Sequence, residues 1–322
     1  MKFLSSIKIF KFRELGVFMV LIGLIIVLSV VTTTFLSPRN IINVVRQAVE
    51  ISIMAIGMTF VIVSAEIDLS VGSTYGATAM LAATILKAGT SPTLAFAASI
   101  GAGLGIGLLN GCLATKGRMP AFIVTLGGML FFRSVAFAIS GGKSLSAFPA
   151  ESLGSWVFAM GGNIGPIPIQ VIIMAVMYAI AIVIMKKTKF GFEVYATGGN
   201  KRAAMLAGIN VDRIKTTGFM ISGAMSALAG MISIAFLKSV PTTAGQGREM
   251  DVIAAVILGG AALSGGRGSA LGTLIGALIM SVIRNGMVLL RVPAFWQTGC
   301  IGVVIILAVL LDTIITRTGE KR

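Results

Sequence analysis

Apolar runs recur along this chain almost from its first residues to its last, and each is long enough to cross a bilayer as a helix of about 20 residues. Only 11% of the 322 residues are charged, whereas an ordinary soluble domain carries about 25%. Most of the chain must therefore lie in lipid, where a helix satisfies its own backbone hydrogen bonds. We predict an all-α, polytopic membrane protein that forms a single transmembrane domain over residues 1–322.

The lengths of these runs, with the glycine, proline and charged residues between them, predict about ten membrane helices. We place them near residues 15–36, 48–65, 70–88, 92–114, 120–140, 166–185, 215–237, 250–264, 268–290 and 295–314. Lys and Arg residues near helix ends are retained in the cytoplasm. Most of them fall on one side if both termini lie inside, which predicts a cytoplasmic basic N-terminus (1–14), a cytoplasmic connector (186–215) and a cytoplasmic tail (315–322).

The two halves of the chain resemble each other weakly. The sequence "SIMAIGM" around Ser52 precedes Glu66 and Asp68, while "SALAGM" around Ser226 precedes Glu249 and Asp251. Each half continues to glycines spaced by four, which let helix backbones pack closely in lipid: Gly103, Gly107 and Gly111 in the fourth helix, and Gly268, Gly272 and Gly276 in the ninth. Because five helices per half is an odd number, the repeats must be inverted, which is a transporter architecture.

Several kinds of chemistry are absent from the sequence. The chain has no histidine, and its two cysteines lie in apolar runs as expected of small core residues, so we predict no metal site and no catalytic residue. The sequence "GGKS" at 141–144 lacks the first glycine of a phosphate-binding loop, since Phe137 stands there. We therefore expect no nucleotide or other cofactor on this chain, and its scattered basic residues do not predict nucleic-acid binding.

Polar residues inside the apolar runs are candidates for a translocation path or gate, because charges and amides in a membrane usually face the interior of the bundle. The candidates are Glu66, Asp68, Ser70, Asn110, Arg133, Glu249, Asp251, Arg284 and Asn285. Two alternatives stay open. Asp68, Glu249 and Asp251 could cap helix starts, and Arg133 and Arg284 could extend to the lipid headgroups.

The connector 186–215 contains a helix-like run, "NKRAAMLAGINV", in which Asn200 can cap the start and Gly208 can end the helix. Its small apolar residues, Ala203, Ala204, Leu206 and Ala207, suit docking into a groove on a partner. The alternative is a solvated basic loop, which explains the lysines and not the apolar residues.

At these residues the chain resembles the permease subunits of ribose-type sugar ABC importers. The resemblance covers nearly the whole chain and includes "AIGMTFVIVSAEIDLSVGS", "GRMPAFIVTLGG", "YATGGNKRAAMLAGINVDRIK", "SGAMSALAGMI", "TAGQGREMDVIAAVILGGAALSGGRGSALGTLIGALI" and "NGMVLL". It implies a homodimer in the bacterial inner membrane. It further implies an ATPase subunit with tandem nucleotide-binding domains that holds ATP and Mg, and a periplasmic sugar-binding protein.

The resemblance also assigns roles to segments. The stretch from Asn200 to Asn210, with Lys201 and Arg202, would be the helix that couples to the ATPase, and the segments 150–165 and 242–251 would face the binding protein. Ribose is the first expectation for the sugar. The rival class is a secondary transporter or facilitator, which also uses inverted repeats. It is less expected because the acidic residues lie near helix ends and histidine is missing.

Overall fold

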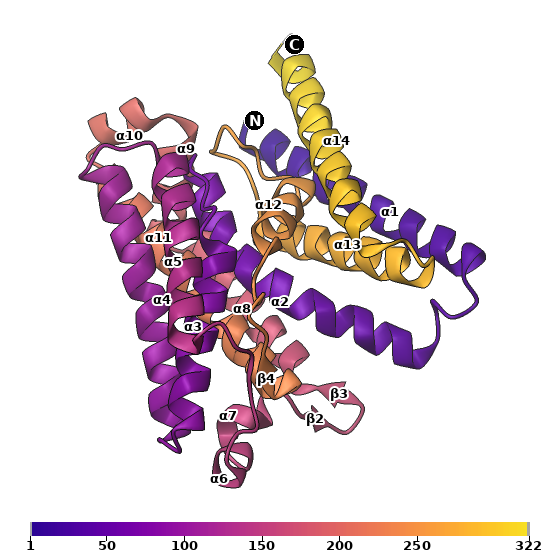
Figure 1. The fold of residues 1–322 in the computed structure, drawn as a ribbon. Coiled ribbons are helices and arrows are strands. Elements are labelled where there is room, and N and C mark those ends of the chain that lie inside the picture. Colours follow the sequence, from indigo (N-terminus) through magenta and orange to yellow (C-terminus); the bar gives the residue numbers. More distant parts are fainter. Residues whose placement is uncertain (1, 321–322) are drawn as a thin grey trace.

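The computed structural model describes residues 2–320, with the side chains of residues 14–307, 309 and 310. The described chain is mostly helical (Figure 1). Its long elements are α1 (Lys2–Val31), α2 (Pro38–Val63), α3 (Val71–Lys87), α4 (Pro92–Thr115), α5 (Ala121–Ser140), α8 (Ile169–Lys187), α9 (Lys189–Gly199), α11 (Val211–Leu237), α12 (Arg248–Leu258), α13 (Ala270–Leu289) and α14 (Ala294–Glu320). Its short elements are β1 (Leu145–Ser146), α6 (Ala150–Leu153), α7 (Trp156–Ala159), β2 (Asn163–Ile164), β3 (Ile167–Pro168), α10 (Lys201–Leu206) and β4 (Ser239–Val240).

A helix stands at each of the ten places that the sequence predicts, and seven of those in the described part are long and apolar enough to cross a membrane. These seven are α2, α4, α5, α8, α11, α13 and the 14–31 part of α1. The other three are α3 with 17 residues, α12 with 11, and α14, whose described apolar part is Ala294–Leu307. The chain is therefore a multi-pass membrane protein.

Several helix boundaries differ from the sequence prediction. Helix α1 begins at Lys2 and ends at Val31, against the predicted 15–36, and α14 continues to Glu320, past the predicted end at 314. Helix α2 begins at Pro38 and not near 48, because the Ser37 hydroxyl accepts from the Asn40 N–H at 3.3 Å and proline suits the first helical turn. Arg46, which the prediction places in a connector, thus lies inside α2. Helix α12 ends at Leu258 and not near 264, because the chain turns at Gly260, whose φ of +91° a residue with a side chain rarely adopts.

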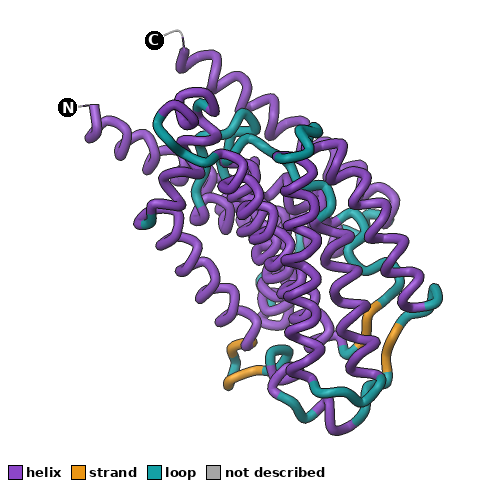
Figure 2. Tube along the Cα trace, turned by 90° about the vertical axis from the view of Figure 1, so that its left-hand side faces the viewer, coloured by secondary structure: helices purple, strands orange, loops and turns teal. Residues whose placement is uncertain are grey.

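The short elements gather at the two ends of the bundle. Figure 1 places α9 and α10 at one end, and α6, α7, β2 and β3 at the opposite end. Figure 2, turned by 90°, shows the strands in orange at the end away from the two termini. At the second end β1 pairs with β4 in antiparallel register, Leu145 opposite Val240. We call these ends the α10 end and the β2–β3 end.

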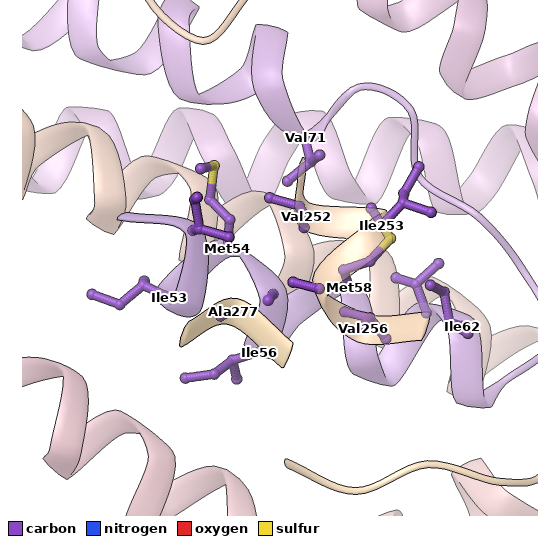
Figure 3. Packing of buried hydrophobic residues seen from close by; sticks show 14 of the residues in the cluster. Ile53, Met54, Ile56, Met58, Ile62, Val71, Val252, Ile253, Val256 and Ala277 are labelled. Atoms are coloured by element: carbon purple, nitrogen blue, oxygen red, sulfur yellow. The ribbon is translucent and has the colours of Figure 1, made fainter. Parts of the chain in front are cut away.

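The centre of the bundle is packed around α2, from which almost every residue between Ala48 and Val63 is buried. Met54, Met58 and Ile62 of α2 lie against Val252 and Val256 of α12 in Figure 3. Both cysteines are free, but Cys112 is half-buried and Cys300 is exposed, so the expectation that they are buried core residues is wrong.

The predicted glycine ladders lie at close helix contacts, with one exception. A Cβ atom at Gly103 or Gly107 of α4 would collide with backbone of α11, and one at Gly111 would lie 2.8 Å from the Thr216 Cα. Gly272 and Gly276 of α13 are pressed in the same way against the backbone of α12. Gly268 lies before α13, which begins at Ala270, and a φ of +155° fits it for the turn rather than for a helix interface.

Candidate transport site and coupling surface

Asp68 is the centre of a buried hydrogen-bond network at the start of α3. Its carboxylate accepts from the Ser70 N–H at 2.9 Å, the Ser70 hydroxyl at 2.6 Å and the Ser222 hydroxyl of α11 at 2.7 Å. Asn110 of α4 donates to the Ser70 hydroxyl at 2.8 Å. Asp68, only 2% exposed, therefore satisfies the turn before α3 and ties it to two neighbouring helices.

The first turn of α12 carries three charged residues, and each reaches a different helix. Arg248 pairs with Glu50 of α2 at 3.1 Å, and Asp251 accepts from Arg284 of α13 at 2.6 and 2.8 Å. Sequence reasoning missed Arg248 because it placed that residue in a connector, and it missed Glu50 although Glu50 lies within the predicted helix 48–65. A helix start favours acidic residues, but the geometry here adds specific cationic partners.

The third pair joins Glu249 to Arg133 of α5 at 3.8 Å, and the Arg133 guanidinium also donates to the Gly245 carbonyl at 3.5 Å. The side chains of Arg133 and Arg284 are 23% and 29% exposed. They do not extend to the headgroups, since both turn to carboxylates within the protein. We call these three ion pairs the α12 anchor.

Asn285 of α13 is bound to Asn40 at the start of α2. Each amide donates to the oxygen of the other, at 3.0 and 2.9 Å, and Asn40 also donates to the Phe35 carbonyl at 2.9 Å. Sequence reasoning identified Asn285 and missed Asn40, which it placed outside any helix. The pair fixes the contact between α2 and α13 with both side chains buried.

The expected helix in the connector 186–215 is α10, and it begins as predicted, because the Asn200 carboxamide accepts from the Ala203 N–H at 2.9 Å. Gly208 follows its end with a φ of +82°. Leu206 is 85% exposed and Met205 50%, whereas Ala204 is buried within this chain. The apolar surface open to a partner is therefore Ala203, Met205, Leu206 and Ala207, and it excludes Ala204.

Helix α9, which sequence reasoning did not separate from the connector, holds α10 against the bundle. A Cβ atom at Gly198 would collide with the Val63 carbonyl at the end of α2, and the same carbonyl accepts from the Gly266 N–H at 2.9 Å. The Tyr195 hydroxyl donates to the Gly268 carbonyl at 2.8 Å. Burial, aided by Glu14, raises the pKa of Tyr195 to about 12, so the hydroxyl stays protonated as the donor at neutral pH.

A further contact joins the same end of the bundle to the turn before α3. Lys215 in the first turns of α11 pairs with Glu66 at 2.5 Å. The α9–α10 segment and the start of α11 thus contact both the 63–66 turn and the 265–268 turn. Within residues 14–307, the structure shows no group of three or more Cys, Asp or Glu side chains that could hold a metal ion.

The chain matches known transport proteins over nearly all of its length. Residues 40–309 match the family described as "Branched-chain amino acid transport system / permease component". The ribose import permease protein RbsC of Bacillus subtilis (strain 168) is 42% identical over 300 residues, covering 93% of this chain and 92% of that protein. RbsC of Escherichia coli (strain K12) is 41% identical, with 91% and 92% covered.

Two other matches are more distant. The xylose transport system permease protein XylH of Haemophilus influenzae is 36% identical, with 94% of this chain and 97% of that protein covered. Among solved structures, an inward-facing ABC transporter of the metal-chelate type matches with a TM-score of 0.49 and 13% identity, over 94% of this chain and 96% of that chain.

Proposed function

This chain belongs to the family of branched-chain amino acid transport system permease components, and on that premise we propose that it is the membrane subunit of an ATP-driven sugar importer. The observation that carries this proposal is its identity of about 40%, over more than nine-tenths of both chains, to ribose import permeases. Ribose is the first candidate for the sugar, and the xylose permease makes other pentoses the next. The chain itself is a transporter subunit and not an enzyme.

The partners follow from this function. ATP and Mg are held by a separate ATPase subunit with tandem nucleotide-binding domains, and a periplasmic sugar-binding protein delivers the sugar. Two copies of this chain form the permease in the bacterial inner membrane. The α10 end is the cytoplasmic end, so both termini lie inside, an orientation supported by the basic residues of the 186–215 connector.

The helices form two inverted repeats. In this repeat α2, α3, α4 and α5 correspond to α11, α12, α13 and α14, in that order. When each helix is replaced by its counterpart, the α4–α11 contact becomes the α13–α2 contact, and the α3–α11 contact becomes the α12–α2 contact. The structure contains all four contacts. The α3–α5 contact likewise becomes the α12–α14 contact. The Asp68 network before α3 and the α12 anchor at the start of α12 are then equivalent features. These matching contacts support the repeat for four helices of each half. They do not include the first helix of each five-helix half, which is α1 in one half and α8 in the other.

The polar residues of the candidate path act as a gate, holding helices in one arrangement. In this structure hydrogen bonds to neighbouring groups are already made by Asp68, Ser70, Asn110 and Asn285. Opening and closing must therefore replace these hydrogen bonds with others. Motion of the ATPase reaches the gate through α10 and α9, because α9 contacts the end of α2 in one half and the turn before α13 in the other. The exposed 150–165 segment at the opposite end, with Trp156 48% and Ile164 63% exposed, receives the binding protein.

Co-purification tests the function. The tagged chain is extracted gently from its native membrane, and the ATPase activity of the purified sample is measured with ribose-loaded binding protein. We expect an ATPase subunit to co-purify and to be stimulated by loaded binding protein. A chain that purifies alone and carries ribose down its gradient in liposomes would instead support the facilitator alternative.

The coupling surface is tested by Leu206→Glu. Leu206 is 85% exposed, so the change leaves the fold intact and places a buried charge in the contact with the ATPase. We expect ribose uptake to fall at least tenfold while the permease remains in the membrane at normal abundance. Phe192→Glu, at an α9 residue 68% exposed, is the matched control for adding a charge nearby. Normal uptake by Leu206→Glu would refute the assignment of α10.

A further inference from the structure

Four polar residues form a stripe along the first half of α2. Asn43, Arg46, Gln47 and Glu50 are spaced by three, one and three residues, which places them on one face of the helix. In a membrane helix such a face normally meets protein or a water-filled space and not lipid. Here it lines a cavity of about 280 Å³.

The opposite walls of this cavity come from three other helices. They are formed chiefly by Gln170 at the start of α8, Phe236 near the end of α11 and Arg248 in the α12 anchor. Gln170 is only 2% exposed, yet its side-chain nitrogen has no hydrogen-bond partner. The buried Nε of Arg46 also lacks a partner. Buried donors are almost always satisfied, so these two indicate a ligand that supplies acceptors.

The mixture of groups defines the class of that ligand. Amide side chains offer donors and acceptors together, and Glu50 offers an acceptor whose charge Arg248 already offsets at 3.1 Å. An anion would face the Glu50 carboxylate, and a cation would face two guanidinium groups. A neutral solute with several hydroxyls can use both donors and acceptors. The cavity, near the lower limit of roughly 300 Å³ for ligand pockets, suits a molecule the size of a monosaccharide.

The cavity adjoins a wider hollow at the β2–β3 end. That hollow, of about 440 Å³, is lined by residues of α6, α7 and β2, and it shares Arg46 and Phe236 with the cavity. The Arg46 guanidinium lies over the Phe236 ring at 4.7 Å and donates to the side chain of Asn163 in β2 at 2.8 Å. Arg46 therefore stands between the two spaces.

We propose that the cavity between α2, α8, α11 and α12 is a sugar-binding subsite within each single copy of the chain, and that Arg46 is its lid. The proposal rests on the proposed sugar transport. A sugar released at the β2–β3 end enters through the hollow, displaces the Arg46 contacts and binds Gln170 and the polar stripe of α2.

Direct binding tests the subsite without the partners. Radiolabelled ribose is equilibrated with the purified permease in detergent, free of ATPase and binding protein, and uptake is measured separately in the complete importer. We expect saturable binding that Gln170→Leu weakens at least tenfold. Gln47→Ala, at an exposed position of the stripe, should weaken it about threefold without disturbing the fold. Gln246→Leu, an exposed residue outside the cavity, is the matched control and should bind like the wild type.

The outcomes separate the subsite from the function. Ribose uptake by the complete importer with no binding to the isolated permease, or binding that Gln170→Leu and Gln47→Ala leave unchanged, would overturn the subsite and leave the importer intact. A complete importer that takes up no sugar would overturn both. Arg46→Ala removes both the lid contacts and a donor to the sugar, so ribose should associate with this variant faster and dissociate from it faster than with the wild type. Unchanged rates would refute the role of Arg46.

Discussion

The Asp251–Arg284 pair of the α12 anchor allows a quantitative prediction. Asp251 is fully buried and accepts two hydrogen bonds from Arg284, at 2.6 and 2.8 Å. Asp251→Asn keeps the shape of the side chain and leaves the guanidinium without its countercharge, which costs about 3–5 kcal/mol for a buried pair. Because Arg284 is 29% exposed, water screens part of this loss, and we expect the lower value of about 3 kcal/mol.

That loss converts into a measurable melting temperature. In a chain of this size 1 kcal/mol corresponds to about 2 °C, so Asp251→Asn should lower the apparent Tm by about 6 °C in detergent. Scans at one fixed rate are compared, since unfolding of such proteins is often irreversible. Asp212→Asn, at an exposed residue in the first turn of α11, is the matched control and should cost less than about 1 kcal/mol.

A double variant isolates the pair itself. Asp251→Asn combined with Arg284→Gln leaves two neutral amides that can bond each other, so at least half of the lost stability should return. Equal falls in Tm for Asp251→Asn and Asp212→Asn, or no recovery in the double variant, would refute the claim that this ion pair anchors α12.

Two further predictions concern glycines with a matched neighbour. Gly107→Leu should prevent α4 from packing on α11 and reduce the folded yield several-fold. Gly105→Leu, on the open side of the same helix, should be tolerated. Equal folded yields of the two variants on size-exclusion chromatography would contradict this prediction. Gly198→Ala should push α9 away from the end of α2 and lower the amount of sugar transported per ATP hydrolysed. Gly199→Ala is the control, because the nearest atom to its Cβ would lie 3.9 Å away. Equal ratios of uptake to ATPase activity in the two variants would contradict this prediction.

The sequence was sufficient for the positions of the helices, because apolar length and glycine or proline punctuation act locally along the chain. It also predicted the cap of α10, since Asn200 and Ala203 are three residues apart. It failed at the start of α2, where the polar stripe with Arg46 breaks the apolar run and was interpreted as a connector. It failed again at α12, whose glycine-rich continuation, 259–268, is apolar enough to suggest a longer helix.

The polar residues show a different limit of sequence reasoning. The sequence left open whether Arg284 lies inside the bundle or extends to the lipid headgroups. Its partner Asp251 is 33 residues away on another helix, so only the packing of α12 on α13 brings them together. The same holds for Asn40 and Asn285, which are 245 residues apart. Likewise, no local pattern indicates that Ala204 is buried while Leu206 is exposed, because α9 and not α10 decides which side faces the bundle.

The shortness of α12 has a consequence for how the protein is made. Eleven residues of helix extend about 16 Å, roughly half of the hydrocarbon core, so α12 cannot be released alone into lipid during synthesis. Glu50 and Arg133 emerge from the ribosome before it and await Arg248 and Glu249. Asp251 has no partner that is synthesised before it, because Arg284 follows it by 33 residues. Insertion of α12 is therefore complete only when α13 follows it, and a nascent chain that stalls between them leaves a carboxylate without its partner.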